Sequence, residues 1–202
     1  MCIRDRIRTH PEGLFLAILY YLGVRRGEAL GLKWGDFDFA ADQVHILRDI
    51  DFTGSTSSEG TLKTAAADRF IPIPAALREM LLPKREAADA YVFHTPSGAP
   101  LPQASYKRMW SRLMVACGCV EWREIAPGTS RPDDILKQVK PTLTPHYFRH
   151  NYVTLLYESG IDPLIAMKIV GHTDYQTTAN IYTHLKEAVS YTHLTLPTNS
   201  RV

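Results

Sequence analysis

TPHYFRHNYVTLLYESGIDPLIAMKIVGHTDYQTTANIYTHL, residues 144–185, is the stretch that decides the fold. Helix-breaking and helix-capping residues divide it. Thr144 and Asp162 are candidate N-caps, because their side-chain oxygens can accept from free backbone N–H groups. Gly160 is placed to end the first helix. We therefore predict consecutive helices over residues 144–159, from 162 to about 170, and from a cap at Thr173 or Asp174 onward.

The polar residues of this stretch form a possible catalytic set. His146 and Arg149 are three residues apart, so they share one helix face; His172 and Tyr182 follow, and Arg25 lies far upstream. Arginine forks match the geometry of phosphate oxygens. Histidines transfer protons near neutral pH, and a tyrosine can act as a covalent nucleophile. Together they could attack a phosphodiester without a metal.

Elsewhere, apolar spacing and turn residues predict a mostly helical α+β domain with a small antiparallel sheet. The expected helices cover residues 11–22, 28–34, 75–86 and 103–116. The expected strands cover residues 44–47, 61–63 and 69–73. Asp51–Gly60 is rich in Ser, Thr and Gly and predicts a turn, and Glu121–Leu143 predicts a long loop.

Composition excludes several classes of protein. The 23 basic and 21 acidic residues give a net charge of +2, so a strong basic field is absent and DNA affinity must come from local clusters. A long apolar run and a secretory signal pattern are also absent, which favours a cytoplasmic protein without a membrane partner. Cys117 and Cys119 have a spacing that suits neither a zinc site nor a redox pair.

The two ends are expected to have a different origin from the rest. The end segments are residues 1–6 and 189–202, and the codons that could encode residues 1–6 and 189–198 match the two strands of a transposon-based sequencing adapter. We therefore expect both segments to be adapter-derived and the natural domain to span residues 7–188. Three of the 23 basic residues and one of the 21 acidic residues lie in these ends, so the remainder is near neutral.

Residues 144–185 and the stretch LGVRRGEALGLKWGDFDF, residues 22–39, resemble the catalytic domain of the tyrosine recombinases, the phage integrase family. Within that family, the sequence of these stretches resembles integrases of bacterial mobile elements. The resemblance implies a tyrosine-recombinase catalytic domain with a three-stranded sheet on one side. It also implies an N-terminal core-binding domain, which we expect to be missing from these 202 residues. The implied partner is double-stranded DNA, bound by a homotetramer when full length, with possible accessory DNA-bending or excision proteins and no cofactor.

The resemblance assigns the arginines to the phosphate. Arg25 and Arg149 bind its non-bridging oxygens, and Glu28 supports Arg25 by fixing its fork. Arg26 is the alternative candidate for the phosphate-binding role of Arg25. If it does not have that role, it is a solvated charge or a charge that contacts the DNA backbone. Without the resemblance, Arg25 and Glu28 would be an ordinary surface pair worth about 0.2–0.5 kcal/mol.

The remaining roles follow the same resemblance. Tyr182 is the nucleophile, Lys63 the general acid for the leaving 5′ oxygen, His146 an acid–base residue and His172 a phosphate contact. His146 and His150 have the spacing of a metal pair, but a guanidinium lies between them and no carboxylate completes a ligand set, so we expect no metal.

The expected function is that of a site-specific DNA recombinase that integrates or excises DNA through a 3′-phosphotyrosine. One alternative is a type IB-like topoisomerase, which shares this chemistry but rejoins the same strand. Another is a truncated DNA-binding module without activity. We expect the 202-residue chain to be a monomer with weak, salt-sensitive DNA affinity.

Overall fold

The computed structural model describes residues 8–53, 56–60, 68–122 and 139–183. Its α-helices are α2 Gly13–Leu22, α3 Arg26–Gly31, α4 Ala75–Leu81, α5 Gln103–Cys117, α7 Pro145–Glu158 and α8 Pro163–Val170. Residues 175–183 are also helical. The short 3-10 helices are η1 Trp34–Asp36 and η3 Leu82–Lys84. The strands are β1 Phe37–Asp38, β2 Gln43–Ile46, β3 Asp49–Thr53, β4 Thr56–Gly60, β5 Arg69–Pro72, β6 Val120–Trp122 and β7 Val139–Pro141.

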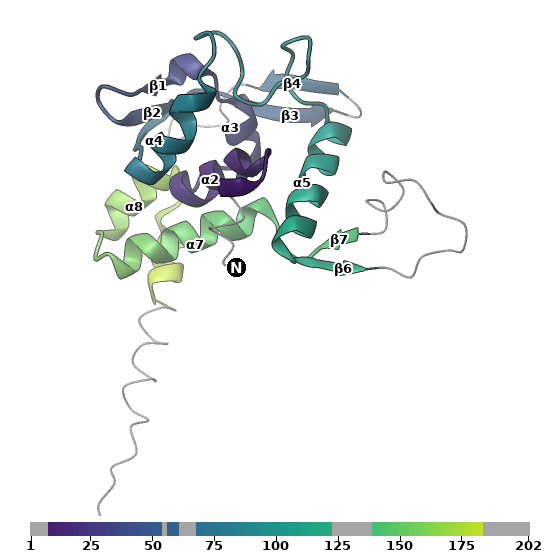
Figure 1. The fold of residues 1–202 in the computed structure, drawn as a ribbon. Coiled ribbons are helices and arrows are strands. Elements are labelled where there is room, and N and C mark those ends of the chain that lie inside the picture. The colour runs from purple at the N-terminus through teal and green to yellow at the C-terminus, as the bar shows by residue number, and fades with distance from the viewer. Residues whose placement is uncertain (1–7, 54–55, 61–67, 123–138, 184–202) are drawn as a thin grey trace, which may run out of the picture.

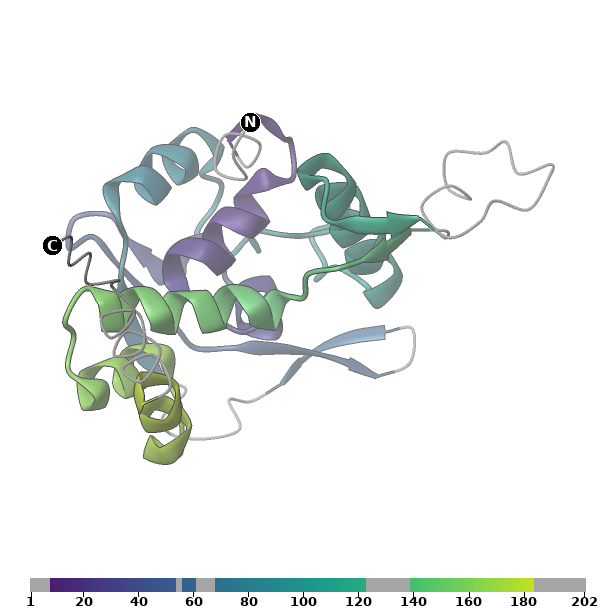
Figure 2. The ribbon, with the colours of Figure 1, turned by 90° about the horizontal axis from the view of Figure 1, so that it is seen from below.

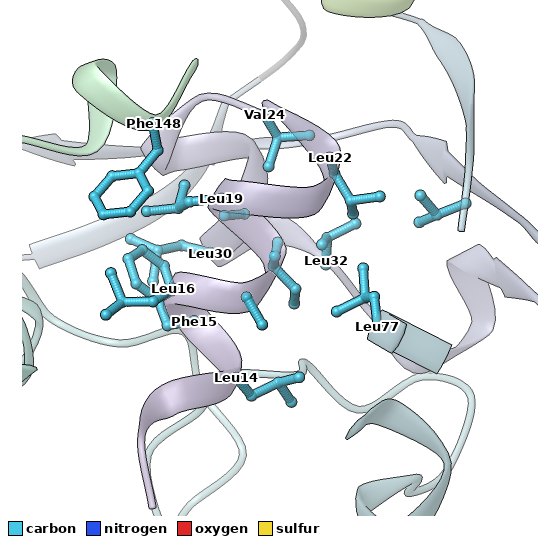
Figure 3. Close-up of a cluster of buried hydrophobic side chains, with 14 of the residues drawn as sticks. Leu14, Phe15, Leu16, Leu19, Leu22, Val24, Leu30, Leu32, Leu77 and Phe148 are labelled. Carbon is cyan, nitrogen blue, oxygen red and sulfur yellow. The ribbon is translucent and has the colours of Figure 1, made fainter. Parts of the chain in front are cut away.

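Helix α2 forms the centre of the fold. Its sequence GLFLAILYYL is apolar on every side, which is typical of a helix enclosed by others. Gly23 ends it with a left-handed φ of 60° and donates its N–H to Leu19 O. Side chains of α2 pack with side chains from α3, α4 and α7 in one buried cluster. Figure 3 shows Leu19, Leu30, Leu77 and Phe148 of this cluster. Helix α7 runs alongside α2 (Figure 2).

The predicted small antiparallel sheet is present. Its strand order is β1-β2-β5, with Val44 opposite both Phe37 and Ile71. The sheet and the β3–β4 hairpin lie on one side of α2, and α7 and α8 lie on the other (Figure 1). The expected strand at residues 61–63 lies outside the described residues, and β1 takes a place in the sheet that was not foreseen. The α+β, mostly helical fold class is confirmed.

The prediction of a turn over Asp51–Gly60 was wrong. The described residues of this segment, 51–53 and 56–60, belong to two paired strands, in which Asp49 pairs with Gly60 and Thr53 with Thr56. The Ser, Thr and Gly content reflects an exposed edge strand, β4, rather than a loop. Ile50 is fully buried, because it packs β3 into the main core. That packing outweighs the local turn preference.

The prediction of a loop from Glu121 to Leu143 was wrong at both ends. Strands β6 and β7 pair antiparallel, with Val120 opposite Pro141 and Trp122 opposite Val139. The hairpin projects from the end of α5 (Figure 1). Residues 123–138 lie outside the described part of the chain. The apolar residues at the strand ends were too few to produce a recognisable alternation.

The C-terminal helices begin at the capping positions predicted from the sequence, and α7 ends shortly before Gly160. Asp162 accepts a hydrogen bond from Leu164 N at 2.8 Å, and Gly160 has a left-handed φ of 72°. Asp174, rather than Thr173, accepts from Gln176 N at 3.0 Å. Thr144 occupies the N-cap position of α7 without a side-chain hydrogen bond. None of the helices within the described ranges is long and apolar enough to cross a membrane.

Candidate active site

Arg25 stands at the junction of α2 and α3. It is the residue before α3, and its backbone N–H donates to Glu28 Oε2 at 2.8 Å. Its guanidinium donates from Nη1 to Glu28 Oε1 at 2.8 Å and from Nη2 to Gly171 O at 3.1 Å. Glu28 is buried whereas the Arg25 side chain is 41% exposed. A buried carboxylate thus orients a guanidinium that still reaches solvent.

Arg149 projects from α7 into the same region. Its side chain is 2% exposed, and Nη1 donates to Gly23 O at 3.1 Å. Glu28 Oε2 lies 3.9 Å from Nη1. Nη2 is buried and has no hydrogen-bond partner among the described residues. Burial, and then the charge of Arg25, lower the pKa of Arg149 to about 9, so the group stays charged at neutral pH.

Arg69 is a third arginine at this centre, and the sequence reading did not single it out. It donates to both carboxylate oxygens of Glu28, at 3.1 and 2.9 Å. The signal that could have found it is the two-residue period of β5. Arg69 and Ile71 are buried whereas Phe70 is exposed, so the arginine occupies the inward face of a strand.

The three guanidiniums around Glu28 carry more positive charge than its single carboxylate can neutralise. Burial by itself raises the pKa of Glu28, but the hydrogen bonds and charge of Arg69, the backbone N–H of Arg25 and the charge of Arg149 outweigh it, and the pKa lies below its ordinary value. One carboxylate faces three guanidiniums. The excess positive charge suits an anion bound at the exposed side of the cluster.

His172 follows the left-handed Gly171 that ends α8. Its Nδ1 is 2.8 Å from the hydroxyl of Thr178, which is fully buried. Burial and then the charges of Arg149 and Arg25 lower the pKa of His172 to about 4. The imidazole is therefore neutral at neutral pH and can donate or accept one hydrogen bond with its other nitrogen.

His146 lies one helical turn before His150 on α7. Burial, followed by the charges of His150, Arg149 and Arg25, lowers the pKa of His146 below its ordinary value. The two imidazole rings meet edge to face with centroids 5.1 Å apart. Within the described ranges, no three His, Cys, Asp or Glu side chains are grouped so as to hold a metal ion.

Two neighbouring hollows connect these residues. The larger, of about 350 Å³, is lined by Arg25, His146 and Arg149 among others. The smaller, of about 40 Å³, is lined by His146, Arg149, His150, Val153, His172, Thr177 and Ile181. His146 and Arg149 border both. Four predicted residues, Arg25, His146, Arg149 and His172, therefore gather in one region of the surface.

Tyr182 does not line either hollow. It is 8% exposed and packs with Val153, Ala166 and Val170. Its hydroxyl donates to Ile161 O at 3.1 Å. Burial, and then the charge of Asp162, raise the pKa of Tyr182. Lys63 lies outside the described residues.

Arg26 has a different environment from Arg25. Its guanidinium lies over the ring of Phe52 at 4.8 Å and over the ring of Tyr106 at 5.5 Å. It lines the larger hollow together with Arg25. Because Arg25 contacts Glu28 while Arg26 rests on aromatic rings, the geometry favours Arg25 as the member of the central cluster.

The comparisons with known proteins identify the family. Residues 4–188 match the profile described as the phage integrase family. The chain is 25% identical to a XerC-like tyrosine recombinase of Caldanaerobacter subterraneus, over 91% of this chain and 48% of the relative. It is 28% identical to the tyrosine recombinase XerA of Pyrococcus furiosus, over 95% of this chain and 57% of the relative. The chain thus spans about half the length of the curated relatives it matches.

Solved structures show the same fold. The integrase of transposon Tn1549, determined with transposon right end DNA, superimposes with a TM-score of 0.67 at 21% identity, over 96% of this chain and 63% of that one. A crystal structure of XerA recombinase gives a TM-score of 0.59 at 20% identity, over 96% of this chain and 64% of that one.

Proposed function

Because the chain belongs to the phage integrase family, we propose that it is the catalytic part of a site-specific DNA recombinase. Such a protein cuts and rejoins DNA strands through a covalent phosphotyrosine. The relatives named as tyrosine recombinases support this reading over a topoisomerase. Its proposed catalytic residues are Arg25, Lys63, His146, Arg149, His172 and Tyr182, with Glu28 in support.

The observation that carries the proposal is the arginine cluster around Glu28. Arg25 is oriented by a buried carboxylate, and Arg149 keeps a buried Nη2 without a partner among the described residues. Both border the larger hollow. A phosphate diester placed there would accept from both guanidiniums and would neutralise part of the excess charge. Preorganised donors of this kind stabilise the charge that grows on phosphoryl oxygens in the transition state.

The proposed cleavage is an exchange of one phosphorus–oxygen bond for another. The phenolic oxygen of Tyr182 attacks phosphorus, and the bond to the 5′ oxygen breaks. The products are a 3′-phosphotyrosine and a free 5′ hydroxyl. His146 accepts the phenolic proton, Lys63 gives a proton to the leaving oxygen, and neutral His172 donates a hydrogen bond to a phosphoryl oxygen. Attack by another strand's 5′ hydroxyl reverses the step and exchanges strands.

The proposed partner is duplex DNA carrying a recombination site. The structures of the Tn1549 integrase, determined with transposon right end DNA and with circular intermediate DNA, support this partner. Assembly into a homotetramer on DNA and help from accessory DNA-bending or excision proteins are further proposals, made by analogy with the family.

A nicked suicide duplex tests the proposal. Cleavage next to the nick releases a short oligonucleotide, so the covalent complex cannot reverse and is visible on a denaturing gel. We expect such a complex with the wild-type chain and none with Tyr182→Phe. A DNA-binding module without activity gives retarded DNA but no covalent band. Joining of two different duplexes, rather than relaxation of one supercoiled plasmid, separates a recombinase from a topoisomerase.

A further inference from the structure

We propose that Arg69 is a positioning residue of the active site. It holds the C-terminal end of α8 and the carboxylate of Glu28 in a fixed position relative to each other. The role rests on the proposed function, because it concerns how Arg25 and His172 are held for DNA cleavage. Arg69 touches neither hollow at the site. It would act through the residues it binds.

The first support is the geometry of the Arg69 guanidinium. Nη1 and Nη2 donate to the two oxygens of Glu28, and Nε donates to Ile169 O at 2.8 Å. The side chains of Arg69 and Glu28 are 6% and 1% exposed. A planar fork that meets both carboxylate oxygens fixes orientation as well as distance, which the single ammonium of a lysine cannot do.

The second support is that the contacts form a closed ring. Glu28 also accepts from Arg25, and Arg25 donates to Gly171 O at 3.1 Å. Gly171 and Ile169 lie at the same end of α8. Because Ile169 O accepts from Arg69, the series of contacts closes at Arg69. Two arginines thus bind two carbonyls at the C-terminus of α8, where the helix dipole favours positive charge.

The third support is the position of the ring in the chain. Arg69 lies on β5, Glu28 on α3 and Ile169 on α8, so the ring joins three elements that are far apart in sequence. His172 directly follows Gly171. Loosening the ring at Arg69 therefore frees the backbone that carries His172 and removes a support of the carboxylate that orients Arg25.

The pKa of His172 offers a readout that a purely structural role would not change. Burial, followed by the charges of Arg149, Arg25, His146 and His150, lowers this pKa to about 4. Arg69→Lys keeps the positive charge at position 69. A rise in the pKa of His172 in this variant would therefore report displacement or solvation of the imidazole rather than loss of a charge.

The experiment compares Arg69→Lys with wild type in the full chain by three measurements. These are NMR titration of the His172 ring, assigned through its absence in His172→Gln, affinity for duplex DNA, and the rate of covalent complex formation with bound suicide duplex. We expect the pKa of His172 to rise from about 4 toward 6.5. Cleavage should slow by about tenfold to a hundredfold. DNA affinity should stay within about threefold, because other phosphate contacts remain.

Arg48→Lys is the matched control. Arg48 also donates from two nitrogens to a buried carboxylate, that of Asp36. It lies outside the ring of contacts around Glu28. We expect it to lower the melting temperature while leaving the His172 titration and cleavage unchanged. An Arg69→Lys variant that loses stability like this control, with the pKa of His172 unchanged and the cleavage rate within about twofold of wild type, would overturn the proposal.

If Arg69→Lys does not fold, Glu28→Gln opens the same ring at its carboxylate, and an unchanged pKa of His172 in that variant overturns the proposal. If the wild-type chain forms no covalent complex, the proposed recombinase function fails. The titration of His172 still tests whether Arg69 holds the end of α8.

Discussion

The hydroxyl of Tyr182 donates a hydrogen bond to the backbone carbonyl of Ile161, 3.1 Å away. The carbonyl belongs to the link between α7 and α8, and the tyrosine ring packs edge to face against Tyr157. Thr177 and Ile181 on the same helix line the small hollow beside His172 instead. The proposed in-line attack by Tyr182 on a phosphate beside Arg25 and Arg149 would therefore require the helix over residues 175–183 to turn or shift when DNA binds.

We predict that Tyr182→Phe abolishes covalent attachment to DNA while leaving DNA affinity nearly unchanged. The substitution removes the proposed nucleophilic oxygen and one hydrogen bond, and the ring keeps its packing. The free energy of unfolding should fall by about 1 kcal/mol. Urea denaturation and a suicide-duplex assay measure the two effects. A phosphotyrosine product that persists in the variant would identify another tyrosine as the nucleophile.

We predict that Gly23→Ala damages both the fold and the site. Gly23 has a left-handed φ of 60°, and an added Cβ would lie 2.2 Å from the ring of Tyr152. Its carbonyl also accepts from Arg149. We expect the free energy of unfolding to fall by about 2–4 kcal/mol, measured by urea denaturation, together with slower cleavage.

Gly118→Ala is the control for that prediction. Gly118 has a similar φ of 70°, but an added Cβ there would meet nothing within 4 Å. Its loss should be only about 1 kcal/mol, which is the backbone strain alone. Equal losses at the two glycines would show that the contact between position 23 and Tyr152 is unimportant.

Local signals were sufficient to predict the C-terminal helices. Gly160 and Asp162 act through their own backbone geometry and side-chain acceptors, so their meaning does not depend on distant residues. The β3–β4 hairpin was missed because its formation depends on Ile50 reaching the core, which the sequence of Asp51–Gly60 does not reveal. Tertiary packing decided the structure there.

The site was predictable to the extent that a resemblance assigned its residues. Arg25, Glu28 and Arg149 meet as expected, although their meeting depends on α7 packing beside α2. Arg69 required knowledge that one face of β5 points inward. The orientation of Tyr182 could not be predicted, because it follows from the packing of its helix against Val153 and Ala166.

We predict that the stability of the fold decreases as the pH falls from about 6.5 to 4. His172 has a pKa near 4 in the folded chain, against 6.5 as its ordinary value. The unfolded chain therefore binds more protons in this window, so the stabilisation is complete above pH 6.5 and is lost on acidification. Melting temperatures across this range should decline less steeply in His172→Gln than in wild type. Parallel declines would show that other groups cause the acid sensitivity.

We predict that Arg149→Met separates stability from function. Arg149 is buried, its Nη2 lacks a partner among the described residues, and its nearest approach to Glu28 is 3.9 Å. Replacing such a desolvated charge with an unbranched apolar side chain should change the free energy of unfolding by no more than about 1 kcal/mol. Arg69→Met removes the two-pronged partner of Glu28 and should cost about 3 kcal/mol or more.

Both substitutions should slow DNA cleavage, but for different reasons. Arg149→Met removes a proposed phosphate donor, so covalent complex formation should fall by at least about a hundredfold and DNA affinity should also weaken. Urea denaturation and the suicide-duplex assay on the two variants give the comparison. If Arg149→Met unfolds as readily as Arg69→Met, then Arg149 stabilises the core through Gly23 O and Glu28. Its buried position would then not be explained by donors kept available for a DNA phosphate.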